Sequence, residues 1–201
     1  MKKPFFQLTA YLLLTSSLLA CSGSQDAVKR ATDTNGNRNA MVADAVNGSG
    51  KVENQLNYDS EFAVAAASSG MLEVALGKLA QQKAIAQEVK DWGKTMETGH
   101  TQVNEQLMAI AGRAGIALPN RMSDDDRDHY DDVDDRKYFG FDKKFLRALK
   151  EAHERDIQRF SEASTKLSNA ELRALAAAAL PTLREHLQQT EQLYERANDR
   201  K

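Results

Sequence analysis

The sequence predicts an all-α fold, a helical bundle that follows an export leader, and three observations support this prediction. After residue 58 the chain is rich in Ala, Leu, Glu, Gln, Lys and Arg, which favour helices, and it has few β-branched runs. Apolar residues recur there at spacings of three and four, the period of an amphipathic helix. The 201 residues, 41% hydrophobic and 28% charged, suffice for one globular domain and its leader.

Residues 1–20 have the pattern of an export signal. Lys2 and Lys3 precede an apolar run over residues 5–14, and the small residue Ala20 stands before Cys21. The apolar run is short and is followed by polar residues, which is unsuited to a membrane span. We therefore expect residues 1–20 to be a signal peptide that is removed.

The chain's single cysteine ends the stretch Leu18-Leu19-Ala20-Cys21, which resembles a bacterial lipobox. The thiol of Cys21 would carry palmitate-type acyl chains, and two or three such chains anchor a protein stably. We thus expect a lipoprotein of the cell envelope, facing the periplasm or the surface, with Ser22 favouring the outer membrane over the inner one. An ordinary secretory leader with a chance cysteine is the alternative.

The segment between the anchor and the domain is predicted to be flexible. Residues 22–57 are rich in Ser, Asn, Asp, Gly and Ala and show no apolar periodicity. The expected organisation is a lipidated cysteine with a tether over residues 21–57, followed by a bundle domain over residues 58–198.

Four helices are expected, at residues 60–82, 87–113, 142–166 and from Ser168 onward. Gly112, Gly115 and Pro119 indicate the end of the second helix. Ser168 and Glu171 have the spacing of a capping box, which predicts the start of the fourth. A long connection between the second and third helices is therefore expected.

One polar residue interrupts the apolar stripe of each helix close to its midpoint: Glu73, His100, His153 and His186. Residues at the same depth of aligned helices meet in one layer. Three imidazoles and a carboxylate are plausible ligands for Fe, Zn, Mn or Cu. Glu97, three residues before His100, is a candidate accessory ligand because such pairs occur in di-iron bundles.

Other interpretations of these features stay open. The layer could be a hydrogen-bonded polar network that fixes helix register without metal. A second Glu-x-x-His pair is absent, which argues against a full di-iron centre. The acidic segment 122–137 lacks the glycine and terminal glutamate of an EF-hand loop, so we predict a solvated segment there. Trp92, Met96 and Met108 are more typical of core than of a ligand pocket.

The span from about residue 57 to 197 resembles the bacterial domain-of-unknown-function 4142 family. The residues that carry the resemblance are spread over all four expected helices: Asp59-Ser60-Glu61-Phe62, Ala65 to Ala67, Glu73-Val74-Ala75-Leu76-Gly77, Met96 to His100, His153, and Pro181 to Leu187. The resemblance implies a ferritin-like four-helix bundle in an exported or lipid-anchored protein. It implies no particular biochemical activity.

The sequence favours a non-enzymatic, membrane-anchored envelope protein with a binding or stress-related role and a possible envelope protein partner. The alternative is a metal-binding or metal-dependent redox protein that uses the Glu/His layer. No nucleophile with an adjacent base and no phosphate-binding glycine loop supports the common enzyme classes. A formal charge of −2 offers no basic face for nucleic acid.

Overall fold

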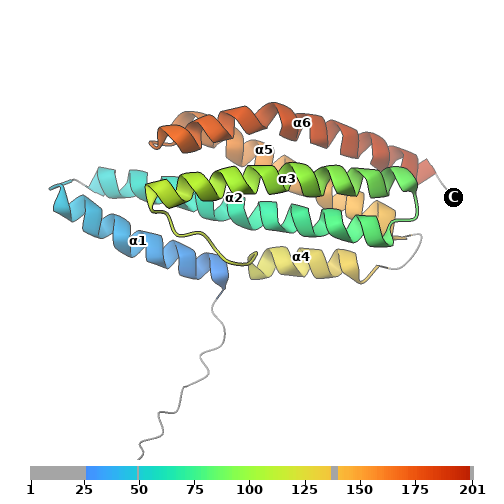
Figure 1. Cartoon of the computed structure of the whole chain (residues 1–201), viewed down its shortest axis with the longest axis horizontal. Coiled ribbons are helices and arrows are strands. Elements are labelled where there is room, and N and C mark those ends of the chain that lie inside the picture. The colour runs from blue at the N-terminus through green and yellow to red at the C-terminus, as the bar shows by residue number, and fades with distance from the viewer. Residues whose placement is uncertain (1–25, 49, 137–139, 200–201) are drawn as a thin grey trace, which may run out of the picture.

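The computed structural model describes residues 26–48, 50–136 and 140–199. Within these ranges the chain forms six α-helices and no strand, so the predicted all-α fold is confirmed (Figure 1). The signal peptide expected over residues 1–20 and the lipidation site Cys21 lie outside the described residues.

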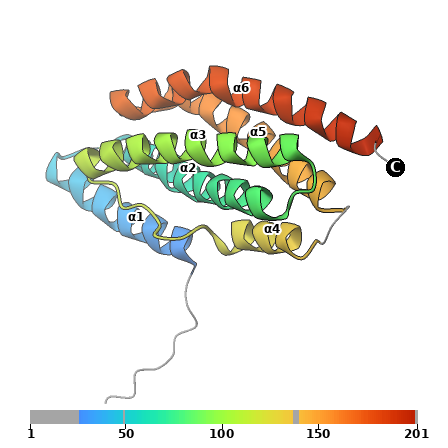
Figure 2. The same ribbon diagram turned by 45° about the vertical axis from the view of Figure 1, so that its right-hand side comes forward.

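Four long helices form the bundle: α2 (Gly50–Lys83), α3 (Gln87–Ala114), α5 (Phe141–Lys166) and α6 (Ala170–Asp199). Helices α2 and α3 form one antiparallel hairpin and α5 and α6 form another; α2 packs on α5, and α3 packs on α6 (Figures 1 and 2). Helices α3 and α5 begin and end within one residue of the predicted limits, and α6 begins two residues after the predicted start at Ser168. The first begins at Gly50 instead of Ser60.

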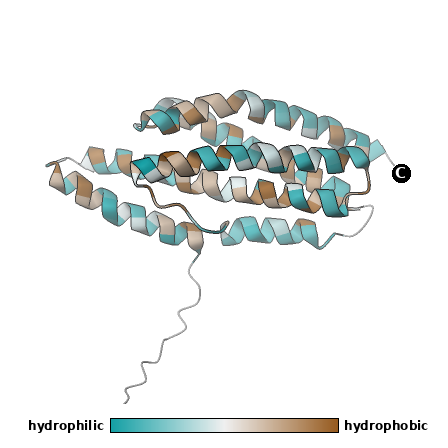
Figure 3. Ribbon diagram, in the orientation of Figure 1, coloured by the Kyte–Doolittle hydropathy of each residue, from teal (hydrophilic) through white to brown (hydrophobic). Residues whose placement is uncertain are grey.

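The connection between the two hairpins crosses the length of the bundle. Helices α3 and α5 run in the same direction, so the chain between them has to return along the molecule (Figure 1). Helix α4 (Asp124–Asp134) lies in this connection and packs on α2 and α5. Its start is capped by the Ser123 side chain, which accepts from the Asp126 amide at 3.0 Å, and aspartates in the first turn complement the helix dipole. The acidic segment is thus mostly helical and hydrophilic (Figure 3).

The prediction of a flexible tether over residues 21–57 is wrong for the part of this segment that the structure describes. Residues Ala27–Ala45 form helix α1, which packs on α2, and residues 50–57 belong to α2 itself. The buried face of α1 consists of small and polar residues such as Ala31 and Asn35, so it gives no apolar periodicity to detect. Asn35 holds the helix in place, because its amide pairs with both the C=O and the N–H of Ala117 at 2.9 and 2.8 Å.

The predicted capping box at the start of α6 is also wrong in its details. The N-terminal cap is Asn169, whose side-chain oxygen accepts from the amides of Glu171 and Leu172 at 3.0 Å. Ser168 instead donates its hydroxyl to Asp59 on α2, and the Asp59 carboxylate also accepts from the Ser168 and Asn169 amides. The Asp59 carboxylate on α2 thus binds the Ser168 hydroxyl, which the sequence pattern had assigned to capping α6.

Helix α2 is the most enclosed element. It is the one described helix that is long and apolar enough to cross a membrane by length and composition, but 72% of its apolar window is buried by the rest of the domain. It contacts α1, α3, α4 and α5, so its hydropathy is that of a core helix. Glycines let α3 approach it closely: a Cβ on Gly77 would lie 2.6 Å from the Gly93 carbonyl oxygen.

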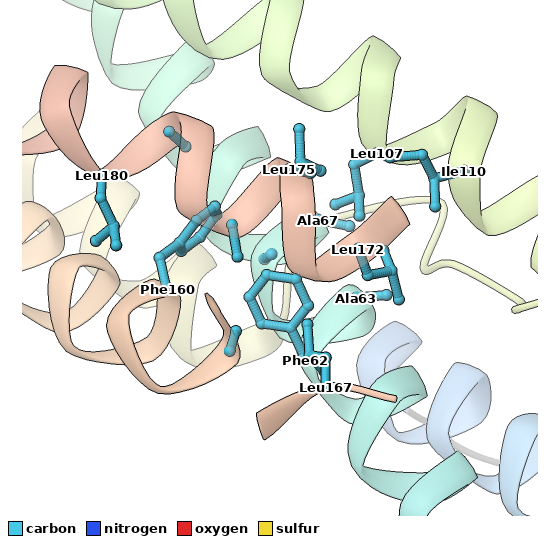
Figure 4. Close-up of a cluster of buried hydrophobic side chains, with 14 of the residues drawn as sticks. Phe62, Ala63, Ala67, Leu107, Ile110, Phe160, Leu167, Leu172, Leu175 and Leu180 are labelled. Atoms are coloured by element: carbon cyan, nitrogen blue, oxygen red, sulfur yellow. The ribbon is translucent and has the colours of Figure 1, made fainter. Parts of the chain in front are cut away.

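Two apolar clusters fill the two ends of the bundle. One contains Phe62, Leu107, Phe160 and Leu172 among its members (Figure 4), and the Phe62 and Phe160 rings meet edge to face with centroids 5.2 Å apart. The other cluster is built around residues that include Leu76, Met96, Phe145 and Leu193. The space between the two clusters holds the polar residues predicted to share a layer.

Candidate metal centre

Each long helix passes from one apolar cluster to the other at its interrupting polar residue. On α2 the first cluster ends at Ala67 and the second begins at Leu72, next to Glu73. On the other helices the same change occurs around His100, His153 and His186. All four side chains are at most 8% exposed. The predicted mid-bundle layer is therefore present, and it separates the two halves of the core.

The three imidazoles of the layer form a nearly equilateral triangle, which we call the histidine triad (His100, His153 and His186). Their ring centroids lie 5.4, 5.5 and 5.6 Å apart. One nitrogen from each ring lies within 4.8 Å of the other two, an arrangement that could hold one metal ion. Nitrogens about 2.0–2.1 Å from a tetrahedral ion would put such centroids about 5 Å apart, so the triangle needs little contraction.

Each triad histidine has one ring nitrogen without a hydrogen-bond partner, and in His153 the bond made by the other ring nitrogen determines which one this is. Nδ1 of His153 lies 2.8 Å from the Leu149 carbonyl oxygen and donates to it, which leaves Nε2 with a free lone pair. Nε2 of His153, Nε2 of His100 and Nδ1 of His186 are all buried without a hydrogen-bond partner in the described structure. A buried nitrogen without a hydrogen-bond partner is unfavourable, and this layer contains three of them. Their burial is explained if another group pairs with them.

Glu73 lies behind the triad and not within it. Its Oε2 is 2.9 Å from Nδ1 of His100 and its Oε1 is 3.5 Å from Nδ1 of His153. Neither oxygen forms a well-directed hydrogen bond, so these contacts are chiefly electrostatic. Since Glu73 faces the Nδ1 atoms while the Nε2 atoms of both histidines are unpaired, its position is that of a carboxylate that orients metal-binding imidazoles. The sequence-based hypothesis had made it a direct ligand.

Burial sets the protonation of the layer. Removal from water lowers the pKa of His100 and of His186 to about 4, and it also lowers the pKa of His153, against the opposing charge of Glu73. Burial raises the pKa of Glu73, an effect that the nearby His153 and arginines counteract. The imidazoles are therefore neutral at pH 7, which is the form that binds metal.

The structure adds an acidic residue to the layer that sequence reasoning missed. Asp156, one turn after His153 on α5, is 3% exposed; it accepts from the Ser69 hydroxyl at 2.9 Å and pairs with Arg159. Burial and the charge of Glu73 raise its pKa to about 7. The available signal was the spacing, because a residue three positions after an inward-facing histidine shares its helix face.

Glu97 is not part of the site, contrary to the sequence-based hypothesis. Its carboxylate accepts from the Gln81 amide at 2.7 Å and lies 3.8 Å from Nζ of Lys78, and its side chain is 32% exposed. Residues three apart on a helix diverge by about 60° around the axis. Glu97 precedes its histidine whereas Asp156 follows its own, so the two offsets run in opposite directions around the helix axis, and the packing of α3 on α2 turns Glu97 toward Gln81 and Lys78.

The remaining candidates from the sequence lie elsewhere. His129 is exposed on α4 and does not join the triad. Met96 is fully buried whereas Met108 is 63% exposed, so the two do not share a pocket. Trp92 packs edge to face on His186 and donates Nε1–H to Thr190 at 3.1 Å, which makes it a support for that histidine.

The family model for a domain of unknown function, DUF4142, matches residues 43–193. The chain belongs to this family. No curated protein and no solved structure matches the chain. The DUF4142 match spans α2 to α5 and most of α6, including the histidine triad and Glu73, and it leaves most of α1 outside.

The chemistry available to this DUF4142 domain follows from the donor set. Three neutral imidazoles supply three nitrogen ligands, and a carboxylate behind them raises the basicity of the ring that it contacts. A tetrahedral ion bound by three protein ligands retains one position for an exchangeable ligand.

Proposed function

We propose that this chain is a lipid-anchored envelope protein whose DUF4142 domain binds one transition-metal ion at the histidine triad. The observation that carries the proposal is a buried group of three histidines in which one nitrogen from each ring lies within 4.8 Å of the other two. Each of these three rings also has a buried nitrogen without a hydrogen-bond partner in the described structure. A single divalent ion would pair with all three, and Glu73 would balance part of its charge.

The donor set favours some metals over others. Imidazole nitrogens suit zinc, copper and iron, whereas manganese prefers oxygen ligands. With Glu73 and Asp156 outside the nitrogen triangle, no carboxylate oxygen completes an oxygen-rich site. Zn²⁺, Cu²⁺ and Fe²⁺ are therefore the expected occupants, and Mn²⁺ is the least suited.

A metal-free polar layer that sets helix register is the competing interpretation. Such a layer stabilises a fold only when its polar groups pair with one another. Here both Glu73 oxygens and one nitrogen of each triad histidine lack a directed hydrogen bond in the described structure. The geometry therefore favours an ion over a self-sufficient hydrogen-bond network.

Metal content tests this function directly. The full-length protein is purified in detergent without a metal-binding tag, and its metal content is measured before and after reconstitution with Zn²⁺. We expect about one ion per chain, lost in His100→Ala, His153→Ala and His186→Ala. His129→Ala is the matched control, because His129 is the one histidine outside the triad and is exposed.

The four variants separate the two interpretations. Loss of metal in the three triad variants but not in His129→Ala supports the metal centre. An absence of metal in the wild-type protein after reconstitution, or equal metal in all four variants, would reject it. In that case the layer acts only through packing and electrostatics.

The membrane anchor is the second part of the proposal. Cys21 follows an export-type leader and is the only cysteine, at the position where lipobox chemistry requires a thiol. Ser22 is the basis for proposing the outer membrane. Acylation is tested by metabolic labelling with an alkyne fatty acid: the wild-type protein should carry label and Cys21→Ala should not. Unlabelled wild-type protein would show that the leader is an ordinary secretory one.

A further inference from the structure

A cavity of about 280 Å³ between α3 and α6 ends against the histidine triad. Its wall includes His100, His186 and Glu73 but not His153. An ion held by the triad would therefore border this cavity on one side, while His153 closes the opposite side. The position left free by three histidine ligands would be reached from the cavity.

The wall of the α3/α6 cavity is suited to an uncharged molecule. Apolar side chains such as Phe160 and Leu175 share it with the uncharged amides of Gln102 and Asn104. Among the described lining residues there is no lysine or arginine, and the acidic ones are Glu73 and Asp156. An anion would approach these two carboxyl groups, and the Arg159 guanidinium beside them is already engaged in an ion pair with Asp156.

The size of the cavity limits the ligand further. Pockets for drug-sized molecules usually have about 300–1,000 Å³, so a cavity of about 280 Å³ suits a smaller molecule. Ala178 and Thr182 on α6 line the cavity and are themselves exposed, so the cavity opens to the surface beside them. A small molecule can therefore reach the triad without opening the apolar clusters.

We infer that the α3/α6 cavity is the binding site of a small uncharged ligand that coordinates the metal ion of the triad at its free position. This inference rests on the proposed metal centre and goes beyond it, since a purely structural metal would have four protein ligands and no exchangeable position. The cavity selects neutral over anionic ligands through Glu73 and Asp156.

The test uses Co²⁺ as the metal, because its visible absorption bands change when a ligand enters its coordination sphere. The full-length protein is loaded with Co²⁺ and titrated separately with imidazole, which is neutral, and with azide, which is anionic. We expect imidazole to shift the bands saturably, and azide to bind at least about 10-fold more weakly. Cobalt content is measured after each titration to detect removal of the metal.

Two variants obstruct the mouth and one matched variant does not. Ala178→Trp and Thr182→Trp place an indole at the cavity, whereas Ala177→Trp adds the same side chain on the exposed neighbouring position, which does not line it. All three sites are exposed, so folding should be preserved. We expect imidazole to bind at least about 10-fold more weakly to at least one obstructed variant, and with unchanged affinity to Ala177→Trp.

The outcomes distinguish this inference from the proposed function. Failure to bind Co²⁺ at all rejects the metal centre itself. Binding of Co²⁺ with no spectral response to imidazole, or with the same response in obstructed and control variants, rejects the cavity as the ligand site and leaves the metal centre intact. Azide binding as strong as imidazole binding overturns the selection for neutral ligands.

Discussion

At the scale of single residues, Glu73 and Glu97 form a natural pair for comparison. Both were candidate ligands, but Glu73 contacts two histidines of the triad while Glu97 binds Gln81 near the surface. We expect Glu73→Gln to weaken metal binding about 10- to 100-fold, because the carboxylate that orients His100 is lost. Glu97→Gln should leave the affinity unchanged. Competitive titration with a chelator measures both, and equal effects would contradict this assignment.

The lowered pKa values of the histidines predict how metal binding depends on pH. Metal competes with protons for the imidazoles, and burial lowers the pKa of His100 and His186 from 6.5 to about 4. Protons therefore compete only near pH 4. We expect affinity to stay nearly constant from pH 7 down to about 5 and then to fall, as measured by the same titration in a series of buffers. A fall centred near pH 6.5, as for exposed histidines, would contradict the burial argument.

The raised pKa of Asp156 predicts that this residue makes the metal-free protein less stable as pH rises. Its pKa is raised from 3.8 to about 7 in the folded state, so the folded form binds more protons than the unfolded form between these values. Stability from this group is present at low pH and is lost as pH rises from about 4 toward 7. The free energy of unfolding of Asp156→Asn, relative to wild type, should therefore increase from pH 4.5 to pH 6.5 in urea unfolding. A decrease over this range would contradict the assignment.

At the scale of elements, polar side chains that bridge distant segments decide where the helices begin and dock. Asp59 on α2 caps the chain before α6, and Asn35 on α1 pairs with the backbone of Ala117 after α3. Each bond joins positions far apart in the sequence. The limits of α6 and the docking of α1 therefore depend on the assembled bundle as well as on local propensity.

The Asn35 contact predicts a measurable loss of stability. Asn35→Ala leaves the N–H and C=O of Ala117 without partners, and an unpaired buried polar group costs about 1–3 kcal/mol. We expect the free energy of unfolding in urea to drop by about that amount. Asn37→Ala on the exposed side of α1 is the control and should change little. A similar change in both variants would show that Asn35 does not anchor α1.

At the scale of the whole molecule, helix α1 changes how far the domain would stand from a membrane if Cys21 carries the proposed lipid anchor. The described residues begin at Asp26, so only four residues separate it from Cys21, and the five Cα–Cα steps between the two can span at most about 18 Å. A disordered tether to residue 57 would have let the domain stand clear of the lipid. With Cys21 acylated, the side of the bundle with α1 and α4 should lie close to the headgroups.

A pair of labels tests this orientation. Helices α1 and α4 lie on one side of the bundle and α6 on the other (Figures 1 and 2). Cys21 is the only cysteine, and the proposed acylation would block its thiol, so an introduced cysteine can be labelled selectively. A fluorophore at Asp128→Cys on α4 should be quenched by headgroup-linked quenchers in vesicles more strongly than one at Gln188→Cys on α6. Equal quenching would indicate a longer or more mobile link.

The sequence by itself determined the helical class, two helix ranges within one residue, the start of α6 within two residues, and the layer of Glu73, His100, His153 and His186. Those features follow from a local period of 3.6 residues and from polar residues that interrupt apolar stripes. Only the tertiary structure decided the roles within the layer. It brought the three imidazole nitrogens together, turned Glu97 toward Gln81, placed Glu73 behind the ligands and added Asp156. It also showed α1, whose buried face is small and polar. Helix rotation, and contacts between residues far apart in the sequence, are set by packing between helices, which no local pattern specifies.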